Sequence, residues 1–287
     1  MGEDAAVYRE RRFTAQDGLS LYYRDHGDAL SPHTPVVCLA GLTRNSRDFE
    51  VLAPRLARKR RVLCLDYRGR GRSDHDPDWR RYTPAVYSGD VSDLLSAAGL
   101  HRVVVVGTSL GGLVAMMLAV ARPTALAGVV LNDIGPDIDA AGLARIAAYV
   151  RAHAQQADWP SAVAFLRKSV VNRYLASDED WLRIARRTWR EEADGRLRSD
   201  FDPAIAKAFG RAPDAGPDSW RLFGALRRVP ALAIRGGESD ILSAATVERM
   251  AGVKPDLARI TVAGVGHAPL LEEPECLSAI DDFLADV

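Results

Sequence analysis

The chain of 287 residues is long enough for one large α/β domain or for a core domain that carries an inserted segment. Its 38 basic and 38 acidic residues cancel, so the charge balance does not favour nucleic acid or an anionic membrane surface as a partner. No apolar run approaches the about 20 residues of a membrane-spanning helix, and the acidic stretch 1–4 does not resemble a signal peptide. We therefore expect a cytoplasmic protein that acts on a small molecule. Nothing in the sequence separates a monomer from a homodimer.

The first half of the chain alternates predicted strands and helices. Two strands, 8–13 and 19–24, flank an Asp-Gly hairpin turn at 17–18. Ser46 is a plausible N-cap for the helix that follows the next strand. Further strands are expected at 36–39, 61–66, 103–106 and 128–133, and helices at 46–58, 84–98 and 112–121. This alternation indicates a mostly parallel sheet with helices on both faces.

The alternation stops between residues 138 and 228, where we find no convincing strand and only helical patches. These patches are at 140–153, 161–174, 179–192 and 220–227. Strands resume at 231–235 and 258–263, and a last helix covers 274–285. We interpret 137–228 as a helical cap over the carboxyl edge of the sheet, where open α/β sheets bind ligands. Residues 1–136 and 229–287 would then form the core domain.

One stretch predicts the chemistry. Val103–Val106 are four β-branched residues typical of a strand buried on both faces, and the apolar run 112–121 is typical of a buried helix. Between them stands Gly107-Thr-Ser-Leu-Gly111, a strand-turn-helix sequence of the Gly-x-Ser-x-Gly type known as a nucleophile elbow. Its glycines let the helix pass close to the strand and leave the Ser109 hydroxyl exposed. The sequence therefore predicts Ser109 as a nucleophile.

A serine nucleophile needs a base, and the base needs a carboxylate that orients it. Among the six histidines, His267 lies in a glycine-rich loop directly after the last predicted strand, at the sheet edge to which Ser109 belongs. Asp240 follows the strand 231–235 and gives the chain order Ser, Asp, His. We predict Asp240 as the acid, with Asp133, at the end of the preceding strand, as its alternative and Glu238 as a residual candidate.

The site also needs donors for an oxyanion. We expect the backbone N–H groups of Leu110, directly after the nucleophile, and of Leu42, in the loop after the strand 36–39. No spacing of His, Asp or Cys suits a closed metal site, and we expect no metal and no cofactor. The cysteines at 38, 64 and 276 have no metal or redox spacing, and we expect reduced thiols, buried at 38 and 64. Further candidates for binding the substrate are Arg44, Asn45, Trp159, Trp181, Trp189 and Trp220.

Taken together, these pieces make the chain resemble a serine hydrolase of the α/β-hydrolase fold over nearly its whole length. The resemblance implies an eight-stranded sheet whose second strand is antiparallel, a helical cap inserted after the sixth strand, and catalysis through an acyl-enzyme. Relatives usually have His-Gly where this chain has Ala40-Gly41, a change in the loop that carries the oxyanion donor. The matching segments are 40–42, 66–73, 107–112, 237–240 and 266–274.

From the motifs we expect an enzyme that cleaves a carboxylic ester or a lactone of a small, largely apolar substrate. One alternative is hydrolysis of a carbon–carbon bond in a vinylogous diketone from aromatic ring cleavage, which the same three residues can perform. The other is a receptor that keeps the fold and binds a small molecule without turnover. Relatives with aspartate as the nucleophile open epoxides or remove halogens, and the serine at position 109 excludes that chemistry.

Overall fold

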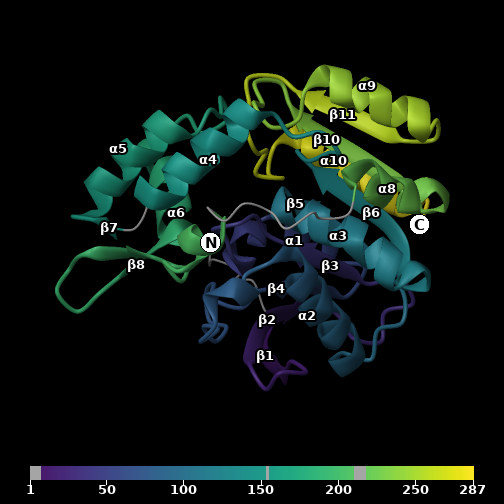
Figure 1. Ribbon diagram of the computed structural model, residues 1–287, viewed down its shortest axis with the longest axis horizontal. Coiled ribbons are helices and arrows are strands. Elements are labelled where there is room, and N and C mark those ends of the chain that lie inside the picture. The colour runs from purple at the N-terminus through teal and green to yellow at the C-terminus, as the bar shows by residue number, and fades with distance from the viewer. Residues whose placement is uncertain (1–7, 153–154, 210–217) are drawn as a thin grey trace.

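The computed structural model describes residues 8–152, 155–209 and 218–287 (Figure 1). An eight-stranded sheet runs through it in the order β1-β2-β4-β3-β5-β6-β10-β11. β2 is antiparallel to both of its neighbours and the remaining pairs are parallel, which confirms the expected sheet. The strands are β1 Tyr8–Thr14, β2 Ser20–His26, β3 Val36–Leu39, β4 Val62–Leu65, β5 Val103–Thr108, β6 Leu126–Asn132, β10 Ala231–Gly236 and β11 Ala258–Val262.

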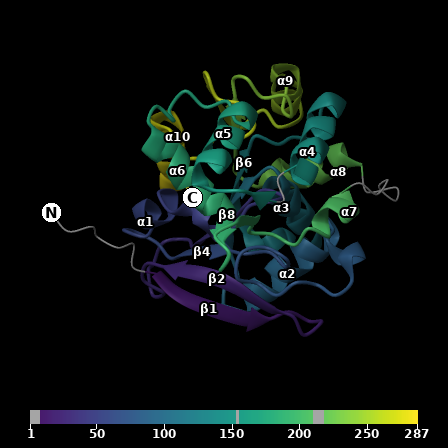
Figure 2. The same ribbon diagram turned by 90° about the vertical axis from the view of Figure 1, so that its left-hand side faces the viewer.

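Alternation along the central strands explains why the sheet is covered on both faces. Val103 and Val105 of β5 pack into one hydrophobic cluster, with α2 (Pro84–Ala97), α3 (Leu110–Ala121) and α9 (Ala244–Val253). Val104 and Val106 pack into a second cluster, with α1 (Leu52–Leu56) and α10 (Pro274–Ala285). Successive side chains of a strand point to opposite faces, so a run of valines fills both clusters. Figure 2 shows β1 and β2 at one edge of the molecule and α9 at the other.

The predicted helix 46–58 is broken in two. A 3₁₀ turn, η1 (Ser46–Phe49), precedes the short helix α1, and its N-cap is Asn45 instead of Ser46. The Ser46 N–H donates to the buried Asp66 carboxylate at 2.6 Å, while the Asn45 side chain accepts from Arg47 N at 3.0 Å. Pro54 explains the break, because its ring clashes with the carbonyl four residues earlier and it lacks an N–H.

The segment after β6 contains α4 (Ala140–Ala152), α5 (Trp159–Ser169) and α6 (Asp178–Thr188), which lie together beside the core in Figure 1. The expectation of no strand here was wrong. β7 (Gln155–Gln156), β8 (Trp189–Glu191) and β9 (Leu197–Ser199) form a small antiparallel sheet. The predicted helix 179–192 stops at Thr188 because the chain turns back at Asp194-Gly195, where Gly195 has φ +80°. An Asp-Gly pair is a strong hairpin signal.

The helices and strands of this segment differ in what they pack against. Side chains of α5, α6, β8 and β9 form a hydrophobic cluster of their own. By contrast, α7 (Ile205–Phe209) and α8 (Ser219–Gly224) place Ile205, Leu222 and Phe223 in the same cluster as α3. The end of the predicted cap segment therefore packs directly onto the core.

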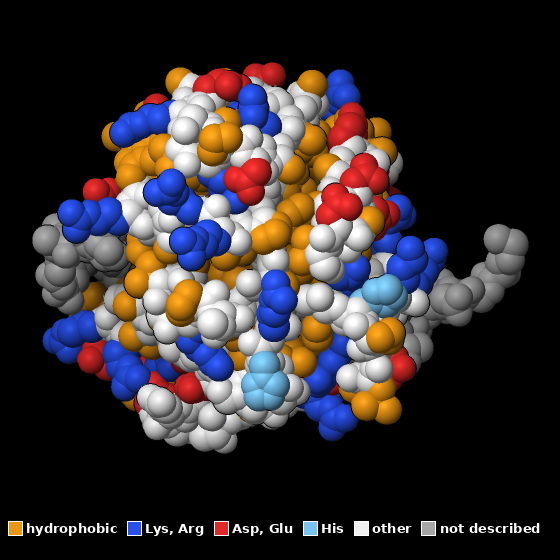
Figure 3. Space-filling view, turned by 90° about the vertical axis from the view of Figure 1, so that its right-hand side faces the viewer, with side chains coloured by type: hydrophobic (Ala, Val, Ile, Leu, Met, Phe, Trp, Pro, Cys, Tyr) orange, Lys and Arg blue, Asp and Glu red, His pale blue; other side chains and the backbone are white. Residues whose placement is uncertain are grey.

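Ion pairs fasten α6 to the core. Arg187, which is 3% exposed, bonds with Glu272 and with Glu50 at 3.1 Å, and Arg183 bonds with Glu272 at 2.6 Å. On the face drawn in Figure 3, basic, acidic and hydrophobic side chains are interspersed. Within the described ranges, no helix has the length and apolar character needed to cross a membrane.

Candidate active site

Ser109 stands at the sharp turn between β5 and α3. Its backbone has φ +52° and ψ −111°, a conformation that costs a non-glycine residue about 1–3 kcal/mol. A Cβ on Gly107 would lie 2.4 Å from the Gly111 carbonyl carbon, and one on Gly111 would lie 2.1 Å from the Leu39 carbonyl oxygen. Only glycine allows the helix to start this close to the strands. The sequence motif thus forms the predicted elbow.

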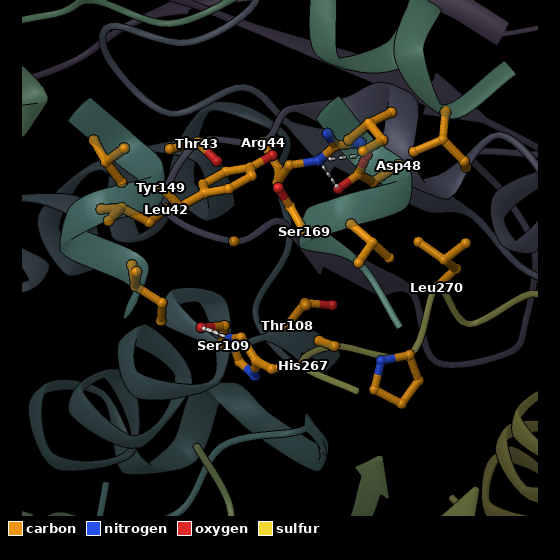
Figure 4. Close-up of a pocket in the computed structure, with 18 of the residues that line it drawn as sticks. Leu42, Thr43, Arg44, Asp48, Thr108, Ser109, Tyr149, Ser169, His267 and Leu270 are labelled. Carbon is orange, nitrogen blue, oxygen red and sulfur yellow. Dashed lines mark hydrogen bonds and ion pairs between the residues drawn. The ribbon is translucent and has the colours of Figure 1, made fainter. Parts of the chain in front are cut away.

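The His267 ring faces Ser109. Its Nε2 lies 3.0 Å from the Ser109 Oγ, and its Nδ1 lies 2.8 Å from the Asp133 Oδ2 (Figure 4 shows the first contact). A neutral histidine that donates Nδ1–H to the carboxylate presents an unprotonated Nε2 to the serine. This arrangement suits proton transfer from the hydroxyl to the imidazole.

The Asp133 side chain is completely buried and held from three sides. Besides His267, it accepts a hydrogen bond from the Gly236 N–H at 2.8 Å and from the Ser239 hydroxyl at 2.6 Å. Its backbone has φ +56°, directly after β6. The donors compensate for burial of the carboxylate and fix its orientation toward the imidazole.

The prediction of Asp240 as the partner of His267 was wrong. The Asp240 carboxylate, 40% exposed, pairs with the Arg145 guanidinium of α4, with Oδ1 2.7 Å from Nη2. The hydrogen bond from Arg145 holds the pKa of Asp240 below its usual value. The loop after β10 instead supplies donors, the Gly236 N–H and the Ser239 hydroxyl, to Asp133. A Cβ on Gly142 would lie 2.1 Å from the Asp240 carbonyl oxygen, so α4 packs directly against this loop.

The two predicted oxyanion donors belong to segments that lie against Ser109. Leu110 is the first residue of α3, and a Cβ on Gly41 would lie 3.9 Å from the Ser109 Cβ. The Leu42 carbonyl accepts a hydrogen bond from the buried Arg70 side chain at 3.0 Å. Sequence reasoning missed this anchor of the loop that has Ala40 in place of the usual histidine. The donor role of the two amides stays a prediction.

Ser109 lies where two cavities meet, and Leu42 and Ile146 also line both. The smaller cavity, about 150 Å³, includes His267 and several polar side chains, with the Arg44–Asp48 pair across from Ser109 in Figure 4. The larger, about 570 Å³, has mostly apolar walls from the core and from α4 and α7. Its apolar side chains include Leu110, Leu113, Ile134, Ile138, Phe209 and Ile241.

Of the six residues predicted to bind the substrate, Arg44 is the one that lines either of these two cavities in the described part of the chain. Its Nε donates to the Asp48 carboxylate at 2.9 Å, and its pKa is raised by that carboxylate against the opposing effect of burial. Asn45 is buried, caps η1 and donates to the Asp200 carboxylate at 2.9 Å. Asn45 therefore has a structural contact network of its own, outside both cavities.

The four tryptophans serve packing within the part of the chain that the structure describes. Trp181 and Trp189 belong to the hydrophobic cluster of α5 and α6. Trp159 donates to Glu191 at 3.2 Å, and Trp220 donates to Asp137 at 2.8 Å. The fifth tryptophan, Trp79, lines the larger cavity instead. Sequence reasoning also missed Tyr149 and Arg145, both in the smaller cavity, because no motif marks them.

Among the described residues, no group of three or more His, Cys, Asp or Glu side chains could hold a metal ion. Cys38, Cys64 and Cys276 are free and buried, as expected for the first two. Burial raises the pKa of the Cys64 and Cys276 thiols, which makes them poor nucleophiles and poor metal ligands.

Known proteins share this architecture. Residues 34–274 match the model of the alpha/beta hydrolase fold family. The chain is 31% identical over 269 residues to a 3-hydroxybutyrate-oligomer hydrolase of Cupriavidus necator, covering 91% of both chains. It is also 31% identical over 248 residues to a 2-(acetamidomethylene)succinate hydrolase of Mesorhizobium japonicum, covering 85% of both. A solved alpha/beta hydrolase from Novosphingobium aromaticivorans superimposes with a TM-score of 0.90 at 44% identity, covering 98% of this chain and 99% of that one.

Proposed function

Since the chain belongs to the α/β-hydrolase fold family, we propose that it is a serine hydrolase that cleaves a carboxylic ester or a lactone of a small molecule. The observation that carries this proposal is the continuous line of hydrogen bonds from Ser109 through His267 to Asp133. A serine, an imidazole and a buried carboxylate in this order are the elements of nucleophilic acyl transfer.

In the first step His267 Nε2 removes the Ser109 proton while Oγ attacks the carbonyl carbon of the ester. The N–H groups of Leu110 and Leu42 would hold the negative charge on the carbonyl oxygen. The carbon–oxygen bond to the alcohol then breaks, and the imidazolium gives its proton to the departing oxygen. Asp133 remains ionised and stabilises the imidazolium through Nδ1–H.

In the second step water takes the place of the alcohol. His267 removes a proton from the water as its oxygen attacks the acyl-enzyme carbonyl. The bond to Ser109 Oγ breaks, Oγ recovers the proton from the imidazolium, and the acid leaves. Apart from the substrate and water, the scheme uses only side chains and backbone amides of this chain.

The relative from Cupriavidus necator supports an ester substrate, because its name describes hydrolysis of a hydroxybutyrate oligomer. The relative from Mesorhizobium japonicum favours a second candidate, hydrolysis of an amide, because its named substrate carries an acetamido group. The same serine and histidine can attack either carbonyl. We place esters first because an alcohol is a better leaving group than an amine and depends less on protonation by the imidazole.

Burst kinetics on p-nitrophenyl acetate test the proposal. We expect a burst of about one equivalent of p-nitrophenol per protein, followed by slower turnover. The Ser109→Ala variant should lose the burst and about 10⁴–10⁶-fold of the turnover. Near-normal turnover by Ser109→Ala would refute the mechanism. A panel of esters, lactones, an acetamido compound and a ring-cleavage dienoate distinguishes the reactions, and binding without turnover in every case would indicate a receptor.

A further inference from the structure

The two cavities beside Ser109 differ in one respect that matters for chemistry. His267 lines the smaller cavity, together with Ala268, Pro269 and Leu270, and it does not line the larger one. In acyl transfer the imidazole delivers its proton to the oxygen that leaves. The leaving oxygen must therefore lie within hydrogen-bond reach of Nε2, on the side of the smaller cavity.

The opposite half of the substrate then extends into the larger cavity. Its volume of about 570 Å³ falls in the range of about 300–1,000 Å³ that is common for small-molecule sites. The hydroxyl groups of the two tyrosines in its wall already form hydrogen bonds within the protein. Tyr82 donates to Asp202, and Tyr87 accepts from Arg70. This cavity offers a substrate mostly carbon surface, which favours a hydrocarbon chain.

The smaller cavity combines apolar walls with the hydroxyl groups of Thr43, Thr108 and Ser169, and its charged side chains are paired. Arg44 is paired with Asp48, and Arg145 is paired with Asp240. A free carboxylate on the leaving half would meet two guanidinium groups whose charges are already neutralised. A neutral hydroxyl avoids the cost of removing a charge from water and still finds donors and acceptors there. The volume of about 150 Å³ admits only a few heavy atoms.

We propose that the substrate is an ester of an apolar acyl chain with a small, neutral alcohol that carries a second hydroxyl group, such as a short diol. The acyl chain lies in the larger cavity and the alcohol in the smaller one. The acyl carbon forms a bond to Ser109 Oγ and loses its bond to the alcohol oxygen, which receives the serine proton through His267. This inference rests on the proposed function and adds the direction in which the substrate binds.

Two ester series measured by acid release in a pH-stat test the assignment. One series varies the acyl chain of ethylene glycol monoesters from acetate to decanoate. The other keeps a butyryl group and varies the alcohol among ethylene glycol, hexanol and glycolate. For the wild-type protein we expect kcat/KM to rise at least about tenfold from acetate to octanoate. It should fall at least about tenfold when ethylene glycol is replaced by hexanol or by the anionic glycolate.

Leucine introduced on either side of Ser109 separates the two halves. Ala147 on α4 lines the larger cavity and Ser169 at the end of α5 lines the smaller one. Ala147→Leu should reduce the octanoate-to-acetate ratio of kcat/KM about tenfold and leave the ethylene glycol-to-hexanol ratio unchanged. Ser169→Leu should reduce the ethylene glycol-to-hexanol ratio and leave the octanoate-to-acetate ratio unchanged. Ala148→Leu is the matched control, because Ala148 is exposed on the same helix outside both cavities. It should keep the wild-type ratios.

The reverse pattern, with Ala147→Leu changing alcohol selectivity and Ser169→Leu changing acyl selectivity, would overturn the assignment. Unchanged ratios in both folded variants would overturn it as well. If Ala147→Leu does not fold, Ala208→Leu on α7 narrows the same cavity. Failure of the proposed function looks different: the wild-type protein would then hydrolyse no ester in either series and show no burst with p-nitrophenyl acetate.

Discussion

Replacing Asp133 by asparagine separates the acid that the structure places beside His267 from the one that motif order suggests. In the wild-type site the Asp133 Oδ1 accepts from the Gly236 N–H, so the asparagine oxygen takes that position. The new NH₂ group then points at Ser239 Oγ and at His267 Nδ1, which lie 2.6 and 2.8 Å from the present Oδ2.

This substitution moves the proton of the His267 imidazole from Nδ1 to Nε2. An NH₂ beside Nδ1 favours the tautomer that carries its proton on Nε2, and that proton faces Ser109. The imidazole can then no longer accept the serine proton. The same exchange of acid for amide in a well-known serine protease lowers kcat by ~10⁴, and we expect a similar loss here. At 1.36 kcal/mol per factor of ten, the barrier rises by about 5.5 kcal/mol.

The assay compares steady-state hydrolysis of p-nitrophenyl acetate by Asp133→Asn and Asp240→Asn at pH 8, with thermal unfolding of both as the check on folding. Asp240→Asn breaks only a partly exposed ion pair with Arg145, a type of contact worth about 0–1 kcal/mol, and should keep kcat within about tenfold. A folded Asp133→Asn variant with more than a tenth of the wild-type kcat would refute this reasoning. So would a loss in Asp240→Asn that exceeds the loss in Asp133→Asn.

The remaining predictions concern stability and packing. Gly111→Ala should destabilise the fold by more than about 4 kcal/mol in urea unfolding, because its methyl group meets the Leu39 backbone, whereas Gly89→Ala on an open helix face should be neutral or stabilising by up to about 1 kcal/mol. Equal stability of the two would contradict the close approach. Arg187→Met should cost about 3 kcal/mol in the same assay, because it removes a buried partner of Glu272, and an unchanged midpoint would show that this pair does not hold α6 to the core. The three buried cysteines should not react with a thiol reagent until the protein is unfolded, when all three should react; a thiol titrated in the native protein would place it at the surface.

The elbow and the histidine could be predicted because each is encoded locally. Ser109 sits between glycines whose close contacts tolerate no side chain, and strand and helix periodicity is strong on both sides. His267 follows the last strand in a short loop, so its place at the sheet edge depends only on the strand order. Parallel strands bring their carboxyl ends to one edge, and the alternation of elements was enough to establish a parallel sheet.

The choice between two acids depended on contacts that no local pattern encodes. Asp133 and Asp240 both follow strands that end at the right edge. What separates them is Arg145, a residue of α4 far from any motif, which pairs with Asp240. The Ser239 hydroxyl, by contrast, is aimed at Asp133. Side-chain partners contributed by a helix outside the sheet motifs cannot be derived from strand order.

Substrate contacts were the least predictable part of the site. The large tryptophans were predicted to bind the substrate. Trp181 and Trp189 instead fill the small hydrophobic cluster in which α5, α6 and the β8–β9 hairpin pack together. The cavity walls are instead made by common residues of α4 and α7, such as Ile146, Ala147 and Ala208. Which face of an amphipathic helix such as α4 turns toward Ser109 depends on how the whole segment packs against its neighbours.

The proposed reaction depends on one serine hydroxyl, activated through His267, that forms the covalent intermediate. Mass spectrometry after treatment with an alkyl fluorophosphonate tests this most directly, because the adduct can be counted on the intact protein and located in a peptide. We predict one adduct per chain, on Ser109, formed at least about 10³-fold more slowly when His267 is replaced by alanine. An adduct on another residue, or equal labelling of the Ser109→Ala variant, would contradict the account.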